Sequence, residues 1–119
     1  MSTKTQRYCF ALDLKDDPDL IAQYKQFHQP DKVWPEITES IRQSGITNMD
    51  IFLTGNRLFM IMEVNENFSF ELMEKINKQN PRADEWEELM WKFQQALPWG
   101  NPNEKWVLME QIFSLSDTN

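Results

Sequence analysis

The spacing of apolar residues predicts that the chain begins with a strand and a helix. Every second residue between Arg7 and Leu14 is apolar or aromatic, as in a strand with one buried face. Asp17 and Pro18 then supply an N-cap and a first helical residue. Pro30 ends this helix, because the residue before a proline is disfavoured in the helical conformation.

The middle of the chain predicts a second helix and a hairpin. Pro35 suits a first helical position, and Gly45 stands where a left-handed C-cap is expected. Two short strands follow, at about 47–54 and 57–64. The Gly-Asn pair between them favours a two-residue turn, so we expect an antiparallel hairpin.

The last third of the chain predicts two more helices and a closing strand. One helix is expected from about 68 to 78, and residues 105–115 are expected to form the last strand. The apolar stripe of the helix between them consists of Trp86, Met90, Phe93 and Leu97. The resulting order, β-α-β-β-α-β, is the split β-α-β arrangement of ferredoxin-like α+β domains.

The second face of the predicted sheet needs a cover. Helices on one face of a four-stranded sheet leave the other face open. Phe52, Phe59 and Ile61 make that face too apolar to stay bare in water. Packing of two sheets against each other is the simplest cover, so we expect a homodimer.

Composition narrows the class of protein. The 119 residues fit one domain, expected to span 1–119 with a core of about 7–115. A net charge of -7 repels phosphate backbones and anionic lipids, so neither a nucleic acid nor a membrane surface is an expected partner. One histidine, three glycines and no metal-binding or phosphate-binding motif predict no metal site and no tightly held cofactor.

Cysteine usage and the N-terminal residues bear on location. Cys9 is the only cysteine, so no internal disulfide can form. The stretch before Arg7 contains no long apolar run, so we expect no signal peptide and no membrane span. A cytoplasmic location is the resulting expectation.

His28, the only histidine, is the candidate general acid–base group. Tyr24 lies one helical turn earlier and shares its helix face. The helix C-terminus nearby favours the imidazolium form, which would suit proton transfer near neutral pH. A histidine in the last turn can instead serve only to cap carbonyl groups, so both roles stay open.

Further aromatic and polar residues are candidates for a ligand pocket, since five tryptophans are many for this length. Trp86 belongs either to the core or to a platform on which a sugar stacks. Trp34 either precedes a helix or lines the pocket wall, with Glu36 offering a carboxylate. Arg57 either binds hydroxyl groups or is an exposed turn residue, and Asp50 faces either a cavity or solvent.

Several local patterns occur together in a specific order. They are Tyr24-x-x-x-His28, Trp34-Pro35-Glu36, Asn48-x-x-Ile51-Phe52-Leu53, Arg57-Leu58-Phe59 with Glu63, Trp86 ahead of Lys92-Phe93, and Glu110-x-Ile112-Phe113. In this order and spacing, from about residue 7 to 115, the chain resembles the L-rhamnose mutarotase family. The resemblance implies a dimeric ferredoxin-like α+β barrel that exchanges α and β pyranose anomers of a 6-deoxy sugar without a cofactor.

The resemblance also implies roles for individual residues. His28 and Tyr24 match the pocket histidine and tyrosine of the family, and Trp86 matches its pocket tryptophan. The remaining candidates for binding the monosaccharide are Trp34, Arg57, Asp50 and Phe52.

The chain departs from the family pattern in ways that bear on the substrate. Met49 and Phe52 stand where tyrosines are common in the family, and the gap between His28 and Trp34 is longer. L-rhamnose is the first expected substrate. The absence of these phenols changes which sugar hydroxyls can be bound, so L-fucose is the next.

Two other functions are compatible with the same pattern. A cofactor-free or haem-handling monooxygenase on the same dimeric barrel also needs an aromatic pocket and, in some cases, one histidine. A non-catalytic dimeric binding module would bind a sugar without changing its rate of anomer exchange.

Overall fold

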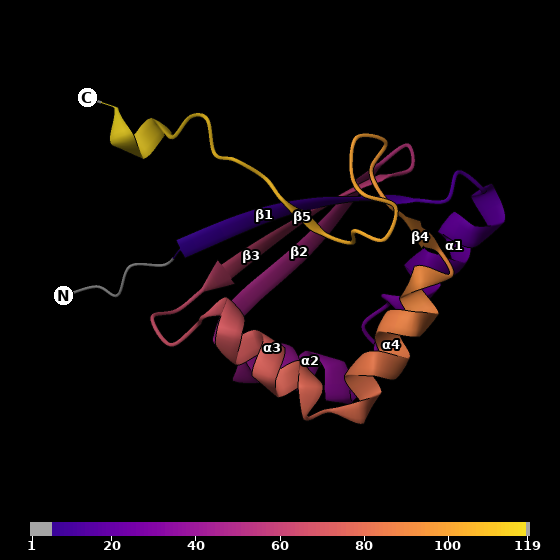
Figure 1. Ribbon diagram of the computed structural model, residues 1–119, viewed down its shortest axis with the longest axis horizontal. Helices are drawn as coiled ribbons and strands as arrows, with labels where there is room; N and C mark the ends of the chain where they lie inside the picture. Colours follow the sequence, from indigo (N-terminus) through magenta and orange to yellow (C-terminus); the bar gives the residue numbers. More distant parts are fainter. Residues whose placement is uncertain (1–5, 119) are drawn as a thin grey trace.

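The computed structural model describes residues 6–118, and within them four helices lie on one side of an antiparallel sheet (Figure 1). The N-terminal stretch in which no signal peptide is expected lies almost entirely outside the described residues. The elements are β1 (Gln6–Leu14), α1 (Pro18–Phe27), α2 (Pro35–Gln43), β2 (Ile46–Thr54), β3 (Arg57–Val64), α3 (Phe70–Lys78), α4 (Pro81–Trp91), β4 (Gln94–Gln95), β5 (Val107–Leu108) and a 3-10 helix (Leu115–Asp117).

The order of the strands confirms the ferredoxin-like α+β fold. The sheet runs β2-β3-β1-β4, and β5 also pairs with β1. β1 pairs with β3 from Gln6 opposite Val64 to Asp13 opposite Arg57, in antiparallel register. β4 and β5 pair antiparallel with β1 at residues 13–14 and 10–11, so they share its second edge.

Local capping chemistry explains where the helices begin. The carboxylate of Asp17 accepts hydrogen bonds from the backbone N–H groups of Asp19 and Leu20 at 2.9 and 3.1 Å, which confirms the predicted N-cap. Asn80 caps α4 by accepting from the N–H of Arg82 at 3.0 Å. Gly45 ends the turn after α2 with a φ of 94°, a conformation that side chains with a Cβ disfavour.

The predicted end of the chain was wrong in two respects. The last helix ends at Trp91, and Phe93 and Leu97 are buried in the chain that follows it. Of the predicted strand 105–115, only Val107–Leu108 pairs with the sheet. Alternation marks residues able to form a strand, but a strand also needs an open edge, and β4 already occupies part of that edge.

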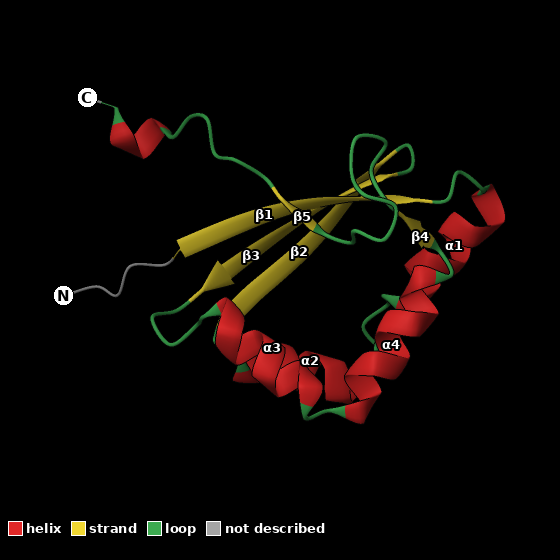
Figure 2. Ribbon diagram, in the orientation of Figure 1, coloured by secondary structure: helices red, strands yellow, loops and turns green. Residues whose placement is uncertain are grey.

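The two faces of the sheet differ in environment. Leu12, Leu58 and Val64 point toward the helices and are almost completely buried. On the opposite face Phe52 and Phe59 stand across from each other and are 56% and 41% exposed, as the pattern predicted for an uncovered face. Figure 2 shows the chain beyond β4 running mainly as loop along the side away from α2, α3 and α4. Within residues 6–118, no helix combines the length and the apolar character needed to cross a bilayer.

Candidate functional site

A cavity of about 600 Å³ lies between the helices and the inner face of the sheet. This volume lies in the range of small-molecule binding sites. One end is formed by polar and aromatic side chains of Tyr24, His28, Trp86, Gln94 and Trp106. The other end is apolar and is lined by Phe10, Ile41, Met49, Met60, Met62 and Met73. The imidazole, phenol and amide of the first end thus lie apart from this apolar cluster, and further polar side chains, among them Thr38, Asn48 and Glu87, also line the cavity.

The hydrogen bond of His28 fixes its tautomer. His28 Nδ1 lies 2.8 Å from the backbone carbonyl oxygen of Tyr24. A carbonyl oxygen only accepts hydrogen bonds, so Nδ1 carries the proton and donates it. In the neutral ring, Nε2 is consequently the nitrogen with a free lone pair. His28 caps a carbonyl group and also lines the cavity, so the two roles left open by the sequence coexist.

Burial controls the charge of His28. Desolvation lowers the pKa of His28 below its usual value, and the hydrogen bond to the carbonyl of Tyr24 opposes this shift only in part. The expectation that the helix end favours imidazolium was therefore wrong, because the cost of burying the charged ring outweighs the attraction to the carbonyl. Near neutral pH the ring is a neutral base.

Tyr24 presents a protonated phenol at the same end of the cavity. Its ring stacks on His28, with ring centroids 4.3 Å apart, and its hydroxyl oxygen accepts a hydrogen bond from Gln94 Nε2 at 3.2 Å. Burial raises the pKa of Tyr24 to about 12, against the opposing effect of the hydrogen bond from Gln94. The phenol therefore keeps its proton and can donate it.

Trp86 forms the aromatic wall beside this pair. Its ring centroid lies 5.5 Å from that of His28 and 5.1 Å from that of Trp34, both at steep interplanar angles. Trp34 packs on the hydrophobic cluster that contains Trp86, and the guanidinium of Arg82 lies 3.9 Å from the centroid of a Trp34 ring. Trp34 therefore packs against the wall without lining the cavity, and the cation–π contact with Arg82 helps to hold it there.

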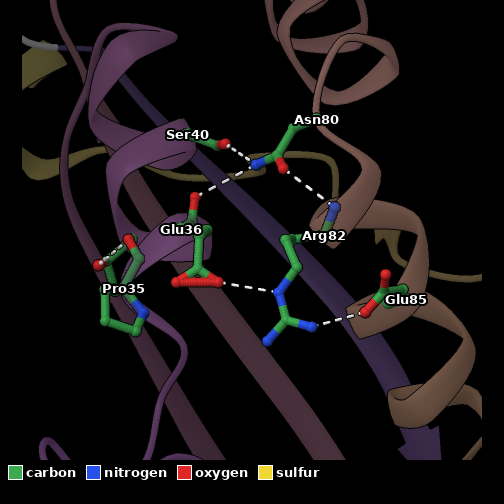
Figure 3. A network of polar contacts seen from close by, with 7 residues as sticks. Pro35, Glu36, Ser40, Asn80, Arg82 and Glu85 are labelled. Carbon is green, nitrogen blue, oxygen red and sulfur yellow. Dashed lines mark hydrogen bonds and ion pairs between the residues drawn. The ribbon is translucent and has the colours of Figure 1, made fainter.

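A polar network joins α2 to α4 beside this wall (Figure 3). Arg82 Nε donates to the Glu36 carboxylate at 2.9 Å, and Asn80 Nδ2 donates to Ser40 Oγ at 2.6 Å. The hydrogen bond from Arg82 lowers the pKa of Glu36. The carboxylate of Glu36 is thus engaged by Arg82, and its role is to join the two helices.

Three of the predicted binding residues, Arg57, Asp50 and Phe52, lie away from the cavity. Arg57 pairs with Asp13 at 2.8 Å, and its guanidinium lies 4.7 Å from a ring centroid of Trp99. Asp50 and Phe52 alternate with the cavity-lining Met49 and Ile51 along β2, so they point to the opposite face. The structure therefore brings Tyr24, His28 and Trp86 together, with Trp34 packed against Trp86, and leaves these three apart.

Two residues of the polar end were not recognised from the sequence. Gln94 follows the apolar stripe of the predicted last helix and was indistinguishable there from a solvent-facing glutamine. Trp106 fell within the predicted closing strand, whose alternation gave no sign of a cavity. No local signal marks either residue, because both reach the cavity through the irregular chain around β4 and β5.

Acidic, cysteine and histidine side chains do not gather into a metal site in the described part of the chain. Among residues 6–118, no three or more of them lie in an arrangement able to hold a metal ion. The side chains at the polar end of the cavity include the imidazole of His28, the phenol of Tyr24 and the amide of Gln94.

Comparison with known proteins gives consistent results from sequence and from structure. Residues 7–115 match the family model described as L-rhamnose mutarotase. An L-fucose mutarotase from Xanthomonas campestris pv. campestris is 46% identical over 94% of this chain and 90% of its own length. An L-rhamnose mutarotase from Tolumonas auensis is 28% identical over 87% of this chain and 90% of its own length.

A solved structure agrees with the fold. The crystal structure of an L-rhamnose mutarotase from Formosa agariphila superposes with a TM-score of 0.66, at 23% identity, over 92% of this chain and 98% of that one. At this identity the likeness concerns the fold alone, and it agrees with the ferredoxin-like strand order described above.

Proposed function

This chain belongs to the L-rhamnose mutarotase family, and from that premise we propose that it interconverts the α and β pyranose anomers of a 6-deoxy sugar. It is then a carbohydrate isomerase. The higher identity to the L-fucose mutarotase, 46% against 28% for the L-rhamnose mutarotase, supports L-fucose ahead of L-rhamnose as the substrate. This reverses the order expected from the sequence alone.

One observation carries the proposed mechanism: a neutral base and a protonated phenol stand side by side in the cavity. Nδ1 of His28 is occupied by the Tyr24 carbonyl, which leaves Nε2 as the base. The Tyr24 phenol, with its pKa raised to about 12, supplies a proton donor. Mutarotation needs one group to take a proton and one to give a proton, and no redox or group-transfer step.

The reaction follows from these two groups. Nε2 of His28 removes the proton of the anomeric hydroxyl, and the electron pair forms the C1 carbonyl as the bond from C1 to the ring oxygen breaks. The ring oxygen takes the proton of the Tyr24 phenol and becomes a hydroxyl group. Rotation about C1–C2 presents the other face of the aldehyde, and the reverse proton transfers close the ring. Each positioned group contributes about 10²–10⁴-fold to the rate.

The aromatic wall is proposed to hold the apolar side of the sugar. Trp86 lies beside both catalytic side chains, and aromatic rings pack well against the C–H face and methyl group of a 6-deoxy sugar. Trp34 packs against Trp86 and is not among the residues that line the cavity, so its proposed role is to shape the wall rather than to contact the sugar.

NMR saturation transfer between the anomeric protons of L-fucose and L-rhamnose tests this function directly. Catalytic amounts of the protein are expected to accelerate exchange of at least one sugar. Binding of a sugar with no acceleration would support a binding module instead. Absence of acceleration together with a haem absorption band, or with oxygen uptake on an aromatic substrate, would support the monooxygenase.

A homodimer in the cytoplasm is part of the proposal. The exposed Phe52 and Phe59 on the outer sheet face support packing against a second copy. Ile112 and Phe113 follow β5 in the chain and are 90% and 66% exposed. Contact with the second copy is proposed to bury them as well. The single, free cysteine suits a reducing compartment.

A further inference from the structure

We propose that Gln94 determines sugar specificity by binding the hydroxyl group on C2, next to the anomeric carbon. The inference rests on the proposed function, because it assumes that a pyranose occupies the cavity with its anomeric carbon between His28 and Tyr24. It assigns a role to a residue outside the catalytic pair.

Gln94 is a buried polar residue at the reacting end of the cavity. It lies in β4, is 5% exposed, and lines the cavity with its side chain. Its Nε2 donates to the hydroxyl oxygen of Tyr24 at 3.2 Å, which anchors the amide beside the proton donor. Buried side-chain polar groups usually have a hydrogen-bond partner.

The rest of the amide faces the cavity. The carbonyl oxygen and second N–H of Gln94 form no hydrogen bond with any of residues 6–118. Within the same residues, no side-chain polar atom that is sealed off from solvent lacks a partner. The carbonyl oxygen of Gln94 is therefore not sealed off and, since Gln94 lines the cavity, it is available to a ligand as an acceptor.

The position of the anomeric carbon decides which part of the sugar Gln94 meets. His28 Nε2 and the Tyr24 phenol must reach the anomeric oxygen and the ring oxygen, which are both bonded to C1. A group hydrogen-bonded to Tyr24 therefore lies close to C1. The neighbouring substituents are the C2 hydroxyl on one side and the C5 methyl group on the other. An amide suits the hydroxyl, whereas Trp86 and the methionine-lined end suit the methyl group.

This contact bears on specificity because L-fucose and L-rhamnose differ in configuration at C2, as they also do at C4. The C2 hydroxyl is equatorial in the L-fucose chair and axial in the L-rhamnose chair. A single fixed amide cannot meet both positions equally well, and a polar group left without its partner lowers the rate for the poorer fit. Gln94 is therefore expected to contribute to the preference between the two sugars.

The experiment compares a Gln94→Met variant with the wild type on L-fucose, L-rhamnose and their 2-deoxy analogues, measuring kcat and KM by saturation transfer. Methionine retains the length of the side chain and removes its hydrogen bonds. Gln95→Met is the matched control, because Gln95 is the next residue of β4 and is exposed. Thermal melting establishes that both variants fold.

The expected result is a loss of kcat/KM that is about tenfold larger for the preferred sugar than for its 2-deoxy analogue, with Gln95→Met unchanged. A loss of kcat/KM that is the same for both substrates would reflect the missing hydrogen bond from residue 94 to Tyr24. Equal losses on the sugar and its 2-deoxy analogue, or no loss on either, would overturn the proposed contact. A wild-type protein that accelerates no sugar would overturn the proposed function, and the inference with it.

Discussion

His28 and Tyr24 are linked twice: their rings stack with centroids 4.3 Å apart, and His28 Nδ1 donates to the Tyr24 carbonyl at 2.8 Å. The first link follows from their spacing of one helical turn, and the second forms because His28 closes the helix as its C-cap. Together they set the orientation and the tautomer of the imidazole before any ligand enters. Predictions about the reaction follow from this pair.

Replacement of the base should abolish most of the activity. In a His28→Gln variant the cavity keeps a similar volume but loses the basic nitrogen, so kcat is expected to fall by about 10²–10⁴-fold. Saturation transfer on the preferred sugar measures the change. Lys25→Gln, an exposed substitution in the same helix, should leave the rate intact. A normal rate in His28→Gln would rule out the assignment.

Removal of the Tyr24 phenol should separate catalysis from packing. Tyr24→Phe retains the ring against His28 but leaves Gln94 without its anchor, so we expect a lower kcat together with a loss of unfolding free energy of about 1 kcal/mol. Kinetics and urea denaturation measure the two effects. Tyr8→Phe serves as the control, since Tyr8 is the only other tyrosine. An unchanged kcat in Tyr24→Phe would assign the proton donor elsewhere.

The protonation of His28 predicts a pH dependence with a definite sign. Folding lowers the pKa of His28, so between the folded and unfolded values the unfolded chain binds more protons. This contribution to stability is fully present above the unfolded pKa of about 6.5, decreases as the pH falls below it, and levels off below the folded value.

The rate should follow the same group. The neutral ring is the base, so kcat is expected to be constant near pH 7 and to fall at a more acidic pH than an ordinary histidine would give. Denaturation curves and saturation transfer across acidic pH measure both effects. The stability component should be absent from His28→Gln, and a rate that rises as His28 becomes protonated would contradict the prediction.

Arg57 is expected to matter for stability and not for binding of the sugar. Its partner Asp13 has only 3% of its side chain exposed, so Arg57→Ala leaves a buried carboxylate without its ion pair. A lower Tm with an unchanged KM is the expected outcome. Arg7→Ala, an exposed position at the start of β1, provides the comparison. A raised KM at an unchanged Tm would instead assign Arg57 to the sugar-binding site.

The outer face of the sheet predicts how the protein assembles. Phe52→Lys places a charge on the apolar face opposite Phe59 and should convert the proposed homodimer to a monomer. Light scattering after size-exclusion chromatography measures the mass. Asn67→Lys adds the same charge at an exposed position away from that face and should leave the mass unchanged. A monomeric wild-type protein would contradict the proposed homodimer.

Local features of this protein were determined by the sequence itself. The N-cap at Asp17 and the turn at Gly55 follow from capping and turn chemistry, which act between residues close in the chain. The pairing of Tyr24 with His28 belongs to the same group, because one helical turn separates them.

The tertiary structure alone decided the remaining properties of the site. Gln94 meets Tyr24 from 70 residues away, through a strand whose place depends on which part of the β1 edge is open. The charge state of His28 depends on how deeply the surrounding elements bury it, since desolvation reflects everything packed around a group. Arg57 does not reach the predicted site, because strand pairing places it beside Asp13 on the opposite face of the sheet. These are contacts between distant segments, and local spacing carries no information about them.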